Sequence, residues 1–176
     1  MREKGCDYFE NSRRAISIQR EYSARNPHGF IGYGPNFWGI TAGDGPGNLD
    51  LRENGQNRRF FGYTDRGAPF GRDDGTIAPW GMVAALPFSP PSALTAIRRM
   101  MERYPNICVG LRLSSGFNPS LVDRGGWISE GHCGLDQGIV VMMIENYRSG
   151  LIWNLMRSCP YPAIGLRRAG FEGGWL

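Results

Sequence analysis

The feature that most constrains this chain is a glycine-rich acidic junction that occurs three times, twice directly before an apolar run. The copies are residues 43–46 (Gly-Asp-Gly-Pro), 73–79 (Asp-Asp-Gly-Thr-Ile-Ala-Pro) and 134–138 (Gly-Leu-Asp-Gln-Gly). A carboxylate at the start of a buried helix is costly unless it caps that helix or takes part in chemistry. We therefore expect one polar site built from several helix starts.

The composition predicts one loop-rich globular domain. The chain has 176 residues, of which 26 are glycine and 12 proline, yet 41% are hydrophobic, which is too apolar for a disordered segment. No apolar run approaches the roughly 18 residues of a membrane span. The first residues also lack the apolar segment of a signal peptide, and the compartment is left open.

The charges and cysteines exclude two common functional classes. The net charge is +4, but the 20 basic residues are scattered, occur at most in pairs, and do not form the basic stripe of a nucleic-acid-binding protein. The four cysteines are far apart and the chain has two histidines, so no zinc site is expected. We expect buried free thiols, and neither a metal nor a cofactor.

Periodicity predicts a chain made mainly of helices. Helices are expected over residues 7–25, 76–87, 89–104, 139–153 and 160–169, and a long polar excursion with a short hairpin over residues 49–74. The second and fourth are apolar on every side, whereas the third has one apolar stripe. Alternating inner and outer helices are typical of an α/α toroid. A plain helical bundle would show the same stripes without needing long glycine-rich loops.

At this point the chain resembles a known family, the glycoamylase-like domain of endo-β-1,2-glucanases and cyclic β-1,2-glucan synthases. Matching stretches follow one another in the family's order over nearly the whole chain. They are residues 5–15 (GCDYFENSRRA), 36–46 (NFWGITAGDGP), 73–79 (DDGTIAP), 116–119 (GFNP), 135–138 (LDQG), 143–153 (MIENYRSGLIW) and 165–171 (GLRRAGF).

The resemblance implies an all-α fold, an (α/α)6 toroid of about twelve helices. Twelve helices need at least about 200 residues, so residues 1–176 are expected to form about half of such a barrel, its C-terminal part, with Met1 an internal residue. The chain departs from the family pattern at several positions. Ser115 stands where the family tends to carry an aspartate, and Trp80 is bulky where the family residue is small.

The implied activity is hydrolysis of a β-linked glucan, with β-1,2-glucan favoured, by two carboxyl groups and no cofactor. We select Asp44 and Asp136 as candidate catalytic residues. The candidate substrate-binding residues are Tyr33, Trp38, Asp73, Asp74, Gln137 and Glu145.

Each candidate also has a structural interpretation. Asp44 suits a turn, one aspartate of 73–74 and Asp136 suit helix caps, Glu145 suits an ion pair with Arg148, and the aromatic residues suit ordinary packing.

Two alternatives to an enzyme stay open. The chain could be a non-catalytic module that binds a glucan oligosaccharide or another protein. It could also complete its fold with a missing N-terminal half or as a homo-oligomer, since half a toroid exposes the sides of its inner helices, and large apolar patches mark interfaces.

Overall fold

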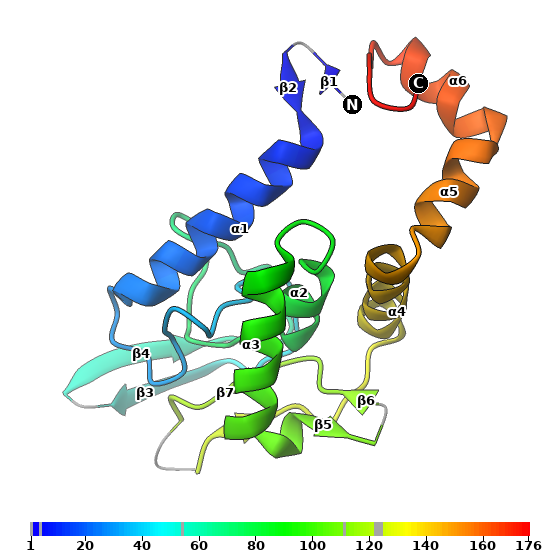
Figure 1. Ribbon diagram of the computed structural model, residues 1–176. Coiled ribbons are helices and arrows are strands. Elements are labelled where there is room, and N and C mark those ends of the chain that lie inside the picture. The colour runs from blue at the N-terminus through cyan, green and yellow to red at the C-terminus, as the bar shows by residue number, and fades with distance from the viewer. Residues whose placement is uncertain (1, 4, 54, 111, 122–124) are drawn as a thin grey trace.

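The computed structural model describes residues 2–3, 5–53, 55–110, 112–121 and 125–176. Within these ranges the chain forms six α-helices, one short 3-10 helix and four small sheets (Figure 1). The helices are α1 (Tyr8–Arg25), α2 (Pro79–Ala84), α3 (Pro90–Arg103), η1 (Pro105–Ile107), α4 (Gly134–Arg148), α5 (Leu151–Ser158) and α6 (Pro160–Arg168).

Each of the four sheets is an antiparallel pair of two strands. The pairs are β1 (Arg2–Glu3) with β2 (Cys6–Asp7), β3 (Leu49–Glu53) with β4 (Gln56–Phe60), β5 (Cys108–Val109) with β6 (Arg112–Leu113), and β7 (Phe117–Asn118) with β8 (Trp127–Ile128). The hairpin expected within 49–74 is confirmed. The expectation of an all-α chain was too narrow, because the glycine-rich stretch 105–133 pairs locally instead of staying irregular.

Helix α1 begins and ends where the sequence indicates. The Asp7 side chain accepts hydrogen bonds from the backbone N–H groups of Phe9 and Glu10, which satisfies two donors that a helix start leaves unpaired. At the other end Asn26 takes a left-handed conformation with φ 44° directly before Pro27, and the helix stops there.

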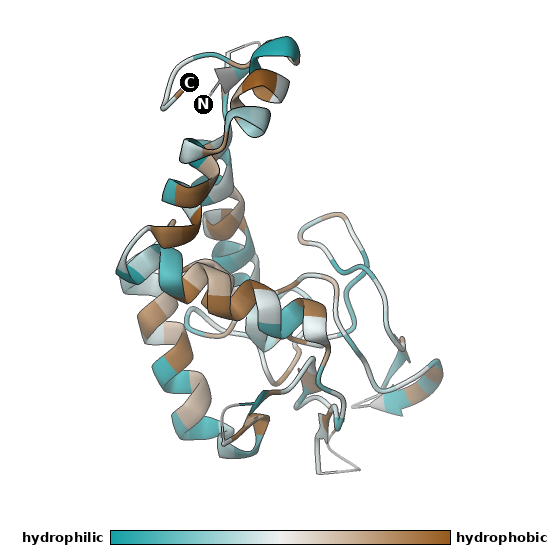
Figure 2. Ribbon diagram, turned by 90° about the vertical axis from the view of Figure 1, so that its right-hand side faces the viewer, coloured by the Kyte–Doolittle hydropathy of each residue, from teal (hydrophilic) through white to brown (hydrophobic). Residues whose placement is uncertain are grey.

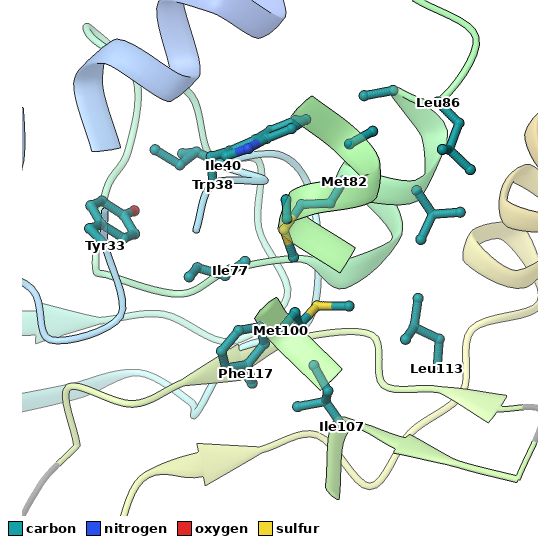
Figure 3. Close-up of a cluster of buried hydrophobic side chains, with 14 of the residues drawn as sticks. Tyr33, Trp38, Ile40, Ile77, Met82, Leu86, Met100, Ile107, Leu113 and Phe117 are labelled. Carbon is teal, nitrogen blue, oxygen red and sulfur yellow. The ribbon is translucent and has the colours of Figure 1, made fainter. Parts of the chain in front are cut away.

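The hydrophobic core lies between the 30–40 loop, α2, α3 and β7 (Figure 3). Trp38 and Ile40 come from the loop, Met82 from α2, Met100 from α3 and Phe117 from β7, and each of these side chains is at most 1% exposed. As expected, α2 is largely buried and α3 is amphipathic, with Ala93, Ala96 and Met100 on its buried side.

Helices α4, α5 and α6 form an arm that leads away from this core (Figure 1). The single helix predicted over 139–153 is instead two helices, because Gly150 adopts φ 70° and interrupts the ladder between α4 and α5. The apolar run 139–144 was expected to be buried on all sides, and this was wrong. Helix α4 packs on α2 on one side, while Val141 is 65% and Met142 43% exposed.

The beginning of the described chain lies beside its end at the tip of the arm (Figure 1). The rings of Tyr8 in α1 and Phe171 after α6 have centroids 5.2 Å apart. The cysteines are free thiols, as expected, but Cys6 is exposed and the other three are partly buried, so the expected full burial was wrong. In the part of the chain that the structure describes, no helix is long and apolar enough to cross a membrane.

Candidate active site

Asp44 lies in the loop between α1 and β3, partly buried against the segment that precedes β7. Its Oδ1 accepts a hydrogen bond from the N–H of Gly45 at 2.9 Å, and its Oδ2 accepts one from the hydroxyl of Ser129 at 2.6 Å. A Cβ on Gly116 would stand 2.3 Å from the carbonyl oxygen of Asp44, so this close approach requires glycine at position 116.

Asp136 occupies the first turn of α4, and it is 3% exposed. Its Oδ2 has no hydrogen-bond partner among the described residues. Burial raises the pKa of Asp136, and a hydrogen bond with Ser115 partly opposes this rise. The Ser115 hydroxyl also accepts from the N–H of Cys133, at 3.0 Å. Asp136 therefore keeps its proton to a higher pH than an ordinary aspartate does, and its Oδ2 is unpaired among the described residues, two properties that suit a general acid.

Consecutive residues join the two candidate carboxyl groups. Gly116 packs on the backbone of Asp44, and its neighbour Ser115 contacts the side chain of Asp136. Since adjacent Cα atoms are about 3.8 Å apart, both aspartates belong to one local group. We name this group, with Ser129, the Asp44–Asp136 cluster. Two of the three acidic junctions, residues 43–46 in a loop and residues 134–138 at the start of α4, thus lie near one another, whereas Asp73 and Asp74 of the third bond other partners.

Helix α2 also contacts the loop that carries Asp44. The indole N–H of Trp80 donates to the carbonyl oxygen of Ala42 at 3.1 Å. The bulky residue noted at this position thus anchors the backbone two residues before Asp44, and part of its side chain stays accessible.

Asp74 serves the fold in this structure. It forms a two-pronged ion pair with Arg66, at 2.8 and 2.9 Å, and the two side chains are 0% and 1% exposed. It also accepts from the N–H groups of Phe61 and Thr76. Burial alone would raise the pKa of Asp74, but the hydrogen bonds and charge of Arg66 outweigh it, helped by Thr76, and the pKa is lowered.

Asp73 connects its loop to two tyrosines. It accepts hydrogen bonds from the hydroxyl of Tyr33 at 2.6 Å and from that of Tyr22 in α1 at 2.7 Å. Burial, followed by the neighbouring Asp73 carboxylate, raises the pKa of Tyr33 well above its ordinary value. Both tyrosines thus stay protonated and act as donors. Tyr33 and Asp73 satisfy one another, with Tyr33 only 9% exposed.

The remaining predicted contacts lie in structural surroundings. The amide of Gln137 makes two hydrogen bonds with the backbone of Leu113, at 2.8 and 3.4 Å, and so ties α4 to β6. Glu145 pairs with Arg148 at 3.7 Å, as expected from their spacing, and accepts from the hydroxyl of Ser149. Trp38 is 1% exposed within the core, so in this structure its ring has no free face.

Sequence reasoning missed three partners of these carboxylates. Nothing in the polar stretch 49–74 marks Arg66 among the other arginines as the one that enters the interior. Ser115 was noticed only as a departure from a family pattern, and Ser129 carried no signal. Among the described residues no three His, Cys, Asp or Glu side chains gather as a metal site.

This chain is similar to known proteins in both sequence and structure. An exo-β-1,2-glucooligosaccharide sophorohydrolase (non-reducing end) of Parabacteroides distasonis is 32% identical over 166 residues, which are 94% of this chain and 21% of that protein. A "putative glucoamylase" of Bacteroides uniformis superposes with a TM-score of 0.83 at 32% identity, over 99% of this chain and 38% of that one.

An endo-β-1,2-glucanase from Chitinophaga pinensis, solved with sophorotriose and glucose, gives a TM-score of 0.78 at 28% identity, over 99% of this chain and 38% of that one. The chain thus spans about a fifth of the curated relative and under two fifths of these solved structures. The family model described as "Putative glucoamylase" matches residues 1–160. The chain therefore belongs to the glycoamylase family.

Proposed function

We propose that this chain carries part of the glucan site of a glycoside hydrolase, with Asp136 as general acid and Asp44 as the second carboxylate. The observation that carries the proposal is the Asp136 side chain, which is almost fully buried, has a raised pKa and has one oxygen without a partner among the residues that the structure describes. Glycoside hydrolysis needs one carboxyl group that keeps its proton and a second that is ionised.

Asp44 fits the second role because its surroundings differ from those of Asp136. The N–H of Gly45 and the hydroxyl of Ser129 donate hydrogen bonds to its two oxygens and hold the carboxyl group in one orientation. A protonated Asp136 would donate its proton to the oxygen of the leaving sugar. Asp44 would activate a water molecule or attack the sugar directly, and the separation of the carboxyl groups around a bound glucan decides between these routes.

The substrate class we propose is a β-1,2-linked glucan. The sophorohydrolase and the endo-β-1,2-glucanase among the relatives are named for this linkage. We further propose that residues 1–176 form the C-terminal part of an (α/α)6 toroid. The helix-rich fold and the 38% share of the longer relatives support this arrangement. Asp73, Asp74, Gln137, Glu145, Tyr33 and Trp38 would then support the walls of the site more than they touch sugar.

The test is hydrolysis of linear β-1,2-glucooligosaccharides by the purified chain, followed by chromatography of the products. Asp136→Asn and Asp44→Asn are each expected to lower the rate by 100-fold or more, in line with the usual contribution of acid–base groups. Asp50→Asn is the matched control, because Asp50 is exposed and pairs only with Arg59 among the residues described. Unchanged hydrolysis by Asp136→Asn would overturn the assignment.

A second candidate function is glucan binding without turnover. The observation that favours it is that 62% of the B. uniformis structure has no counterpart in this chain, because the match covers 38%. Calorimetric titration with the same oligosaccharides separates the two functions. Binding that Asp136→Asn weakens, in a chain that releases no product, would favour this candidate over hydrolysis.

A further inference from the structure

Two segments of the chain run antiparallel beside each other at the candidate site. Gly43 and Thr64 form an isolated antiparallel bridge, in which each backbone N–H donates to the carbonyl oxygen of the other residue at 3.2 Å. The Arg66 guanidinium holds the segments together, because it donates to the carbonyl oxygens of Gly43 at 3.0 Å and Gly62 at 3.3 Å. Arg66 is itself fixed by its buried ion pair, so the relative position of the two segments is well defined.

Asp44 and Tyr63 are neighbours across these two segments. They are the residues next to the bridge, one on each segment, so antiparallel pairing places them opposite one another. Beyond them the segments stay close, since a Cβ on Gly45 would stand 2.9 Å from the carbonyl oxygen of Gly62. Side chains opposite one another in an antiparallel pair extend from the same face, with Cβ atoms usually about 4.5–5.5 Å apart. A ligand bound at the Asp44 carboxylate would therefore lie within reach of the Tyr63 ring.

The Tyr63 side chain is open to a ligand. It is 64% exposed, and it takes part in no hydrogen bond and no ring contact among the described residues. Phe61, two residues earlier, differs because the guanidinium groups of Arg59 and Arg72 each lie 5.9 Å from its ring centroid. Figure 2 shows the loop between β4 and α2, which begins with these residues, on the side of the molecule away from α5 and α6.

An exposed aromatic ring beside a carboxylate suits a ligand that has both an apolar and a polar side. A glucosyl unit is such a ligand, because its C–H groups form an apolar face and its hydroxyl groups surround the edge of the ring. Ligand sites commonly combine aromatic side chains with a few polar groups in this way. The same pairing would fix the orientation of the sugar, since the ring of Tyr63 sets its plane and the carboxylate of Asp44 its edge.

We propose that Tyr63 forms a sugar subsite next to Asp44, in which its ring stacks on the C–H face of a glucosyl unit of the bound glucan. This inference rests on the proposed glucan site, but it concerns binding by Tyr63 and not catalysis by either aspartate. The aromatic ring supplies the contact, so phenylalanine at this position would serve nearly as well as tyrosine.

The experiment compares Tyr63→Ala and Tyr63→Phe with the parent chain. Linear β-1,2-glucooligosaccharides are titrated into each protein by calorimetry, which detects binding without turnover. We expect Tyr63→Ala to weaken binding about tenfold, because the stacking surface is lost, and Tyr63→Phe to bind within about threefold of the parent. In hydrolysis the loss in Tyr63→Ala should appear mainly as a higher KM, with a smaller change in kcat.

Tyr161→Ala is the matched control. It makes the same substitution at a tyrosine that is 80% exposed, in α6 at the end of the arm, and it is expected to bind the oligosaccharides as the parent does. Circular dichroism confirms that all three variants fold.

Three results would overturn the proposal. The first is no binding of the oligosaccharides by the parent chain, and the second is equal binding by Tyr63→Ala and the parent. The third is a loss in Tyr63→Phe as large as that in Tyr63→Ala, which would assign the effect to the hydroxyl group and not to stacking.

Hydrolysis by Asp44→Asn and Asp136→Asn, measured in parallel, separates this inference from the proposed function. If neither variant lowers the rate while Tyr63→Ala weakens binding, the catalytic roles fail and the sugar subsite stands. If both variants lower the rate while Tyr63→Ala binds as the parent does, the subsite fails and the catalytic roles stand.

Discussion

Two regions of this molecule, residues 26–121 and the arm of α4, α5 and α6, differ in how much of their structure is buried. In the region from residue 26 to residue 121, loops with little regular structure are fixed by buried contacts such as the Arg66–Asp74 pair and the Trp38 packing. In the arm, α4 buries Asp136 and Asn146, but the fully described helices α5 and α6, of 8 and 9 residues, have no buried residue. Regular secondary structure therefore does not imply burial here, and the buried hydrophobic cluster lies in the region with the long loops.

The largest effect that would test this contrast is expected from Asp74→Asn. The change leaves the buried guanidinium of Arg66 without its charge partner, which typically costs about 3–5 kcal/mol of unfolding free energy. Asp50→Asn, which breaks the exposed pair with Arg59, is expected to cost at most about 1 kcal/mol. Urea unfolding of both variants measures the difference, and equal losses would contradict the contrast.

The difference in unfolding free energy between the parent chain and Asp74→Asn also depends on pH. The pKa of Asp74 is lowered in the folded chain, so its contribution is fully present above the ordinary aspartate pKa of about 3.9. It is lost as the pH falls through the lowered folded-state value. The gap between parent and Asp74→Asn should therefore narrow in acid.

The same substitution at two methionines compares the two regions directly. Met100→Ala opens a cavity in the core, where the side chain is 1% exposed, and is expected to cost about 2–5 kcal/mol. Met156→Ala in the arm removes a side chain that is 49% exposed and is expected to change stability by about 0.5 kcal/mol or less. Thermal unfolding measures both. A large loss for Met156→Ala would show that the arm is already packed.

A smaller effect is expected from Tyr33→Phe, which removes one of the two tyrosine hydroxyls bound to Asp73. Loss of this hydrogen bond at a buried position is expected to cost about 1–2 kcal/mol. Tyr161→Phe in α6 is the control, because Tyr161 is 80% exposed. Denaturant unfolding of both variants should show a loss of unfolding free energy for Tyr33→Phe alone. Similar losses for both variants would show that the Tyr33–Asp73 hydrogen bond does not stabilise the fold.

The smallest effect on stability is expected from Asp136→Asn, which should stabilise the chain, whereas the preceding substitutions destabilise it. The pKa of Asp136 is raised by burial, so the folded state holds the proton more tightly than the unfolded chain does. The stability that this group supplies is complete below the ordinary aspartate pKa and is lost as the pH rises through the raised value. The neutral amide should therefore stabilise the chain by less than about 1 kcal/mol at pH 8, and by less still at pH 4. Melting temperatures at both pH values test this, and destabilisation at pH 8 would contradict it.

The sequence was a good guide where local chemistry decides the structure. The helix expected over residues 7–25 is α1, which begins after Asp7 and ends before Asn26, and the short hairpin expected within residues 49–74 is β3–β4. The helix α3 followed from its apolar stripe. The interruption at Gly150 was missed because a glycine inside an apolar pattern is compatible with a continuous helix, and its left-handed backbone is fixed only by the fold.

The candidate site shows the same division. The acidic junctions indicated that Asp44 and Asp136 lie at helix or loop starts, and the structure brings both to the Ser115–Gly116 segment. Their surroundings differ because Ser129 bonds Asp44 and because Asp136 is buried. Neither fact can be inferred from the position of these residues in the sequence. Asp73 and Asp74 looked equivalent in the sequence, yet one bonds two tyrosines and the other a buried arginine.

The sequence by itself determined the family, the predominance of helices and the positions of the acidic junctions, because these depend on residue order and on interactions within a few residues. The tertiary structure alone decided which carboxylate forms a buried ion pair and which carboxylate has an oxygen without a partner among the described residues. It also decided which apolar helix sides are exposed. Those properties depend on partners far away along the chain, as with Ser129 and Asp44, whose contact spans 85 positions. Burial and pairing are properties of the assembled fold, and they set the pKa and the accessibility of each side chain.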